Sequence, residues 1–188
     1  MKKYGNDYRQ NGKKFDYVGD WYECSLDAAA LKKQAVRYFA EMAAALALFI
    51  AGLSLNNLGG SVFYVLMPYA FLIFPIFYGL MGGAALYSFC RRLEGKKTQE
   101  VIIPSGHTGH MMHADYEKGV LRPARSSMGV AVLSGIALAG DLILLIQHPD
   151  GLILSRELIF AAAAALLLAI GIITCRQTRR IKDATRKL

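Results

Sequence analysis

The stretch from Leu152 to Cys175, LILSRELIFAAAAALLLAIGIITC, decides the fold. As a helix it is long enough to cross the hydrocarbon core of a bilayer, about 30 Å thick, because a helix rises about 1.5 Å per residue. Three further apolar blocks lie upstream, at about residues 39–58, 62–90 and 128–146. Soluble cores spread their apolar residues at helix or strand periods and do not gather them in such blocks. We therefore predict an all-α, polytopic membrane protein with four transmembrane helices.

Short links join these spans in pairs. Asn56 to Ser61 and Gln147 to Gly151 leave room only for a turn, which predicts two antiparallel hairpins. Pro68 and Pro75 predict a kink or a tilt in the second span, because proline removes a backbone donor and clashes with the preceding turn. The predicted segments are a polar and aromatic arm at 1–24, a lead-in helix with the first hairpin at 25–90, a loop at 91–127, the second hairpin at 128–175 and a basic tail at 176–188.

Basic residues indicate the orientation. Of the 22 Lys and Arg residues, all except Arg156 fall in the first 38 residues, in the stretch from Arg91 to Arg125, or after Cys175. Basic flanks stay in the cytoplasm during insertion, so both termini and the central loop are predicted to be cytoplasmic. The formal net charge of +8 follows from this asymmetry and favours attraction to anionic lipids, so nucleic acid is not an expected partner.

Small residues recur at helical spacing in three spans. They allow close approach of helix backbones in lipid, which suits either a tight four-helix bundle or the face of a homodimer or of another membrane-protein partner. The three sets are Gly79 and Gly83; Ser127, Ala131, Gly135 and Ala139; and Ala161, Ala165 and Ala169.

The segment before the first span has two interpretations. Asn11-Gly12 favours a type I′ hairpin turn, whereas a flexible tail with its aromatic residues at the lipid headgroups fits the composition equally well. Ser25 is predicted to be an N-cap, with the helix continuing from Leu26 to Phe39 into the first span.

The cysteines predict no disulfide. Cys24, Cys90 and Cys175 all fall on the predicted cytoplasmic side, where thiols stay reduced, and there is no CxxC pair for thiol redox chemistry. No cofactor is expected.

One cluster in the central loop could bind metal. His107, His110, His113 and Asp115 are potential ligands, since imidazole suits zinc, copper and nickel, and the neighbouring methionines favour Cu(I). The alternative is a solvated loop that binds metal only adventitiously.

The same loop contains Pro104-Ser105-Gly106-His107, which resembles the second motif of the type 2 phosphatidic acid phosphatase superfamily. That resemblance implies phosphoryl transfer with His107 protonating the leaving group. The family also needs a downstream nucleophilic histidine after Ser-Arg, and Ser155-Arg156 is followed by apolar residues. Without a nucleophile the reaction has no first step, so no enzyme is predicted.

Carboxylates in the spans raise the alternative of transport. Glu41 in the first span resembles the first-span glutamate of the small multidrug resistance transporters, a resemblance that implies proton-coupled cation exchange. Those transporters pair antiparallel because their charge bias is weak, and the bias here is strong. Asp141 and Glu157 remain as carboxylates within the spans, which makes them functional candidates. We predict that Asp141 forms an ion pair with Arg156 across the second hairpin, because both lie at similar depth beside the same turn.

Tyr17-Val18-Gly19-Asp20-Trp21-Tyr22, followed by a short basic helix and by Met67-Pro68-Tyr69, resembles small bacterial four-span membrane proteins of unassigned function. This resemblance implies a bacterial plasma membrane and no particular activity. The function expected from the sequence is that of a non-enzymatic accessory or interaction subunit of a membrane assembly. The alternatives are a small, dimeric transporter that uses Asp141 and, third, a metal-binding or phosphatase-like activity at the histidine loop.

Overall fold

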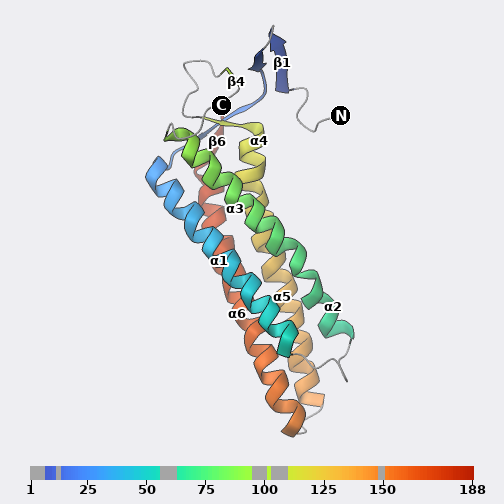
Figure 1. Cartoon of the computed structure of the whole chain (residues 1–188). Helices are drawn as coiled ribbons and strands as arrows, with labels where there is room; N and C mark the ends of the chain where they lie inside the picture. Colours follow the sequence, from blue (N-terminus) through green and yellow to red (C-terminus); the bar gives the residue numbers. More distant parts are fainter. Residues whose placement is uncertain (1–6, 12–13, 56–62, 95–100, 103–109, 148–150) are drawn as a thin grey trace.

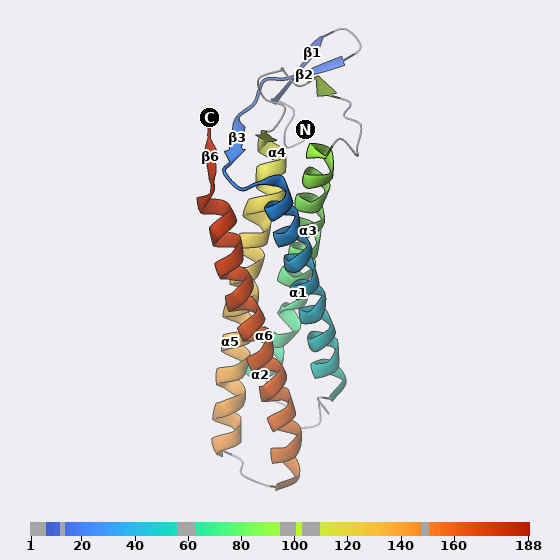
Figure 2. The same cartoon turned by 90° about the vertical axis from the view of Figure 1, so that its left-hand side faces the viewer.

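The computed structural model describes residues 7–11, 14–55, 63–94, 101–102, 110–147 and 151–188, with backbone alone at 10–11, 14–15, 54–55, 63–66, 101–102 and 151–157. Within these ranges, four helices are long and apolar enough to cross a membrane. They lie side by side in one elongated bundle (Figures 1 and 2). The chain is therefore an all-α, multi-pass membrane protein, as the apolar blocks predicted.

The first span is one continuous helix, α1 (Ala28–Leu55), as predicted from the segment that leads into it. Its first turn closes on Asp27, whose carbonyl accepts a hydrogen bond from the N–H of Leu31 at 2.8 Å. The prediction that Ser25 caps this helix is wrong. The N–H and the hydroxyl of Ser25 both donate to the carbonyl of Ala184, at 2.9 and 3.2 Å, so this residue joins the arm to the tail of the chain.

The second span is divided into α2 (Phe63–Phe71) and α3 (Ile73–Leu93), with the break at Leu72. The N–H of Leu72 bonds to the carbonyl of Tyr69, only three residues back, at 3.1 Å. Pro75 has no N–H to continue the helical ladder across this point. The break falls between the two prolines, in the span where the sequence predicts a kink or a tilt.

The third span begins earlier than its apolar block. A short helix, α4 (His113–Tyr116), continues through a π-helical turn, η3 (Glu117–Leu121), into α5 (Arg122–Gln147). Gly119 in this turn lies so close to α3 that a Cβ there would be 3.2 Å from the Cα of Leu86. The last helix, α6 (Gly151–Asp183), completes the bundle.

Short strands form two small sheets at one end of the bundle (Figures 1 and 2). In the first, β1 pairs with β2 as a hairpin, with Tyr8 opposite Tyr17, and β2 also pairs with β4. In the second, β3 lies between β5 and β6. This sheet therefore joins the N-terminal arm, the central segment (residues 91–127) and the C-terminal tail. We call these two sheets the cap. Its strands are β1 (Tyr8–Asn11), β2 (Lys14–Tyr17), β3 (Trp21–Cys24), β4 (Val101–Ile102), β5 (Met111–Met112) and β6 (Thr185–Lys187).

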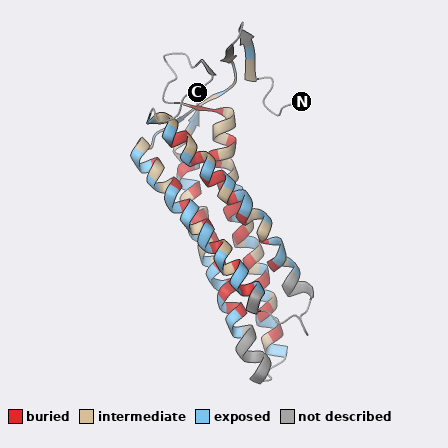
Figure 3. Cartoon of the chain, viewed as in Figure 1, coloured by how far each residue is buried: buried red, intermediate tan, exposed pale blue. Residues whose placement is uncertain are grey.

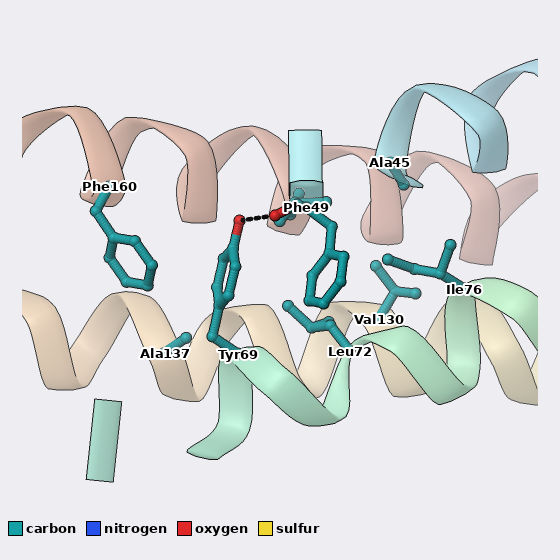
Figure 4. Close-up of a cluster of buried hydrophobic side chains, with 9 residues drawn as sticks. Ala45, Phe49, Tyr69, Leu72, Ile76, Val130, Ala137 and Phe160 are labelled. Carbon is teal, nitrogen blue, oxygen red and sulfur yellow. Dashed lines mark hydrogen bonds between the residues drawn. The ribbon is translucent and has the colours of Figure 1, made fainter. Parts of the chain in front are cut away.

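Two clusters of buried side chains form the core, and Figure 3 shows buried positions following the inner faces of the helices. The cluster in the far half of the bundle centres on Tyr69, whose hydroxyl donates to the carbonyls of Leu48 and Phe49, at 3.2 Å each. The Tyr69 ring lies between Phe160 and Phe49, with centroids 4.6 and 5.4 Å away (Figure 4). The cluster beneath the cap contains Leu31, Ala35, Leu86, Phe89, Cys90, Met111, Val120 and Ile181.

Several of the predicted small residues pack within the chain. A Cβ on Gly79 would meet Ser126, Tyr38 and Met42 within 2.9 Å, and Gly83 faces Tyr38. Beside them, the Ser126 hydroxyl donates to the carbonyl of Pro75 at 2.5 Å and so joins α3 to α5. These glycines therefore serve the four-helix bundle itself.

Candidate functional site

Of the predicted histidine cluster, His113 is fixed at the junction of cap and bundle. Its backbone N–H donates to the Tyr17 hydroxyl at 2.8 Å, and that hydroxyl donates in turn to the carbonyl of Asp20 at 2.8 Å. The His113 Nδ1 lies 3.4 Å from a carboxylate oxygen of Asp7. His113 thus holds the N-terminal arm against the start of α4.

Asp115 is engaged elsewhere, in an ion pair with Arg92 near the end of α3. His110 is half-buried just before β5, and His107 lies outside the described residues. Within the part of the chain that the structure describes, no three His, Cys, Asp or Glu residues are grouped so as to hold a metal ion. The metal site predicted from the four residues stays a prediction, because His107 belongs to it.

The two methionines beside the histidines serve in packing. Met111 and Met112 form β5 and are both buried, and the Tyr8 hydroxyl lies 3.8 Å from the Met112 sulfur. Next to them Tyr22 stacks on Tyr116 with ring centroids 4.1 Å apart. These aromatic and thioether side chains pack the cap against the helices beneath it.

Burial raises the pKa of two phenols in the cap. The pKa of Tyr17 rises to about 12, chiefly through desolvation, although the hydrogen bond from the His113 N–H acts in the opposite direction. The pKa of Tyr8 is also raised, first by desolvation and then by the nearby carboxylate of Asp115. Both phenols stay protonated at neutral pH, so the Tyr17 hydroxyl remains a donor to Asp20.

Asp141 lies in the interior of the bundle, on α5, with no exposed surface. Close contacts fix the antiparallel register of α5 and α6, because Gly171 faces Ala131 and Gly135 faces Leu168. Continuing this register places Asp141 level with Ala161, among buried residues of α6.

Arg156 lies on α6 about one and a half turns beyond that level, roughly 7 Å along the axis at 1.5 Å per residue. A long arginine side chain can extend over such a distance. Its side chain lies outside the described residues, so the predicted pair with Asp141 stays a prediction.

Two surface features were not anticipated from the sequence. One is a groove with a volume of about 550 Å³ beside the start of α1, lined by Ala29, Lys32, Lys33, Val36, Arg37 and Glu94. The other is a set of exposed aromatic and methionine side chains on α2 and α3, here called the aromatic–methionine face. Its members are Met67, Phe71, Phe74, Phe77, Tyr78 and Met81. The spacing of Phe74, Phe77, Tyr78 and Met81, at three and four residues, was the available signal for this face.

Comparisons of the chain with protein-family models, with curated proteins and with solved structures found no match.

Proposed function

We propose that this protein is a non-enzymatic accessory subunit that docks against another membrane protein through the aromatic–methionine face. The observation that supports the proposal is the continuity of this face across the break in the second span. Phe71 at the end of α2 and Phe74 in α3 have ring centroids 5.9 Å apart. Phe74 is 67% exposed, and Phe77 and Met81 extend the exposed surface along α3.

The outward faces of α5 and α6 differ in composition. The large hydrophobic residues exposed on the described parts of α5 and α6 are aliphatic or methionine, and none is aromatic: Met128, Val132, Ile136, Leu142, Ile143, Ile146, Leu158, Ile159, Leu166, Ile172 and Ile173. Aliphatic side chains are sufficient for contact with lipid tails. Aromatic and methionine side chains are enriched at protein interfaces, where they provide large contact areas and adaptable packing. The asymmetry favours a protein partner on the side of α2 and α3.

Orientation and location form part of the proposal. The basic residues of the first 38 positions, of the segment from Arg91 to Arg125 and of the tail favour a cytoplasmic cap, with the two short links outside. The membrane is a bacterial plasma membrane, in keeping with the resemblance noted above. A partner subunit would then contact the aromatic–methionine face within the bilayer.

Site-specific photo-crosslinking in native membranes tests this proposal. A benzophenone amino acid replaces Phe74, which it resembles in shape, and in a separate variant replaces Met128. Met128 is 63% exposed, and its neighbour Gly129 packs against Pro75, so the control matches Phe74 in exposure and in depth. We expect a discrete protein adduct at Phe74 and only lipid adducts at Met128. Lipid adducts alone at both positions, or the same protein adducts at both, would overturn the proposal.

A second candidate function is transport, favoured by the complete burial of Asp141 in a span. Ionisable groups inside membranes commonly line ion or substrate pathways. The discriminating variant is Asp141→Asn, which keeps the shape of the side chain. If it folds normally and abolishes proton-driven uptake or efflux in vesicles, the transporter replaces the accessory subunit. Unchanged flux with normal folding would exclude Asp141 from any pathway.

A further inference from the structure

We propose that the groove beside the start of α1 binds the phosphate group of an anionic phospholipid. The groove runs between the first turns of α1 and Glu94, which directly follows α3. Antiparallel packing of α1 and α3 brings these two helix ends together beneath the cap (Figure 1). The inference is independent of the accessory-subunit proposal, because it concerns a different face of the bundle.

The groove contains more positive than negative charge. Lys32, Lys33 and Arg37 contribute three cations, against the single carboxylate of Glu94. The Lys32 Nζ lies 2.7 and 3.1 Å from the two oxygens of Glu94, so these two charges compensate each other. The Arg37 charge is paired in turn with Glu41, so Lys33 carries the excess positive charge, and Lys33 and Arg37 both expose their side chains.

These two residues are four positions apart, so they lie on the same side of α1. The Arg37 Nε donates to Glu41 at 2.8 Å, which orients the guanidinium and leaves its terminal nitrogens for another acceptor. A lysine and a guanidinium on adjacent turns suit a phosphate, which accepts several charge-assisted hydrogen bonds.

Adjacent apolar side chains indicate that the phosphate belongs to a lipid. Val36 lines the groove and is exposed, and Phe39 is exposed one turn further into the span. Basic side chains at the end of a span with exposed apolar residues just below them match the boundary between headgroups and acyl chains. A free phosphate would gain nothing from Val36, whereas an acyl chain would cover it.

The test compares two matched pairs of basic residues in the full-length protein. One variant is Lys33→Gln with Arg37→Gln. The control is Arg176→Gln with Arg180→Gln, another exposed pair four residues apart near the cap end of α6 and outside the groove. Each protein is reconstituted with equal amounts of phosphatidylglycerol and phosphatidylcholine, and lipid retained after detergent extraction is quantified by native mass spectrometry. Thermal unfolding of each variant verifies that it folds.

We expect the groove variant to retain at least fivefold less phosphatidylglycerol than the control and the unchanged protein. Equal losses in both variants would mean diffuse attraction to basic residues and would overturn the proposal, as would equal retention in all proteins. Val36→Ser, an exposed change without loss of charge, should lower retention about twofold. Inorganic phosphate at millimolar concentration should not displace the lipid. Displacement, with Val36→Ser having no effect, would instead assign the groove to free phosphate.

Discussion

Tyr69 shows how a polar group is accommodated in the bundle. Its hydroxyl lies in the apolar core, where an unsatisfied donor costs free energy, and it donates to two carbonyls of α1. Gly52 makes this approach possible, because a Cβ at that position would lie 1.9 Å from the hydroxyl oxygen. A glycine in α1 and a tyrosine in α2 are thus adapted to each other, and neither residue alone reveals the contact in the sequence.

Gly171 is a second position where close approach excludes a side chain. A Cβ there would lie 2.7 Å from the backbone nitrogen of Ala131 and 2.8 Å from its Cα, so α5 and α6 would have to separate. Gly171→Ala should destabilise the protein by about 1 to 3 kcal/mol, as overpacking does, despite the better helix propensity of alanine. Gly135→Ala is the matched control, because its nearest neighbour would be 3.7 Å away. Thermal unfolding in detergent measures both, and an unchanged Gly171→Ala would contradict the packing described.

The predicted pair of Asp141 and Arg156 is tested by a double-mutant cycle. A lone charge at the centre of a span costs about 2.5 to 3.5 kcal/mol on insertion scales, which favours pairing of opposite charges. We expect Asp141→Asn and Arg156→Gln each to destabilise the protein, and the double variant to be less destabilised than the sum of the two. Urea or thermal unfolding in a mild detergent gives the three values. Strict additivity would show that the two side chains do not interact.

Ionisation of Tyr17 should make the stability of the cap depend on pH in the alkaline range. Because its pKa is raised from 10.0 to about 12 in the folded protein, the neutral phenol contributes stability that is complete below pH 10. That stability is lost as the pH rises from 10 to 12, where the unfolded arm gives up the proton more readily. Between pH 10 and 12, the amides of β3 should therefore exchange faster than base catalysis of exchange alone would make them. Tyr17→Phe should remove this additional increase in the exchange rate. An excess that persists in Tyr17→Phe would assign it to another group.

At the scale of elements, the apolar blocks and the prolines were informative because their signals are local. A run of apolar residues specifies a span, and Pro75 breaks the helical ladder wherever the helix packs. The hairpin of β1 and β2 was one of two interpretations of the arm, and the pairing of Tyr8 with Tyr17 decides between them. The start of the third span at His113 was missed, because polar residues that extend a span beyond the bilayer lack its apolar signature.

The second sheet could not be predicted, since its pairings are long-range. Thr185 to Lys187 is a short polar stretch with no local strand pattern, and it becomes a strand only because β3 offers a free edge. The same pairing explains the error at Ser25, whose hydroxyl was expected to cap a helix and instead bonds to Ala184. A local motif was displaced by a partner from the other end of the chain.

Removal of β6 tests the role of this sheet. Deletion of residues 185–188 would leave one edge of β3 unpaired, and we expect faster hydrogen exchange at Trp21 to Cys24 with little change in the amides of α5. The control is Lys187→Gln, which removes the exposed ion pair with Asp20 and should leave exchange at β3 nearly unchanged, because exposed ion pairs contribute little to stability. Unaltered exchange at β3 after the deletion would show that β5 alone holds the strand.

At the scale of the whole molecule, the cap and the far end of the bundle have different characters. At the cap end, the arm, the central segment and the tail are linked through β3, and the cluster beneath the sheets joins them to all four spans. At the other end, the helices are joined in pairs by short links. A partner that binds the cap would therefore contact three distant parts of the sequence together.

The orientation of this asymmetric molecule is the remaining prediction. Twenty-one of the 22 basic residues lie in the first 38 residues, between Arg91 and Arg125, or after Cys175, and such a bias predicts that these segments are cytoplasmic. Single cysteines at Asn57 and Asp150, in a background with the native cysteines replaced by serine, should react with an impermeant maleimide in intact cells. Cys24 in the native chain should not react in intact cells. Because Cys24 is half-buried, a further single-cysteine variant, Val18→Cys, tests the same side of the membrane from an exposed position of the cap. Val18→Cys should react only after the cells are permeabilised. Its labelling in intact cells would place the cap outside and invert the topology proposed.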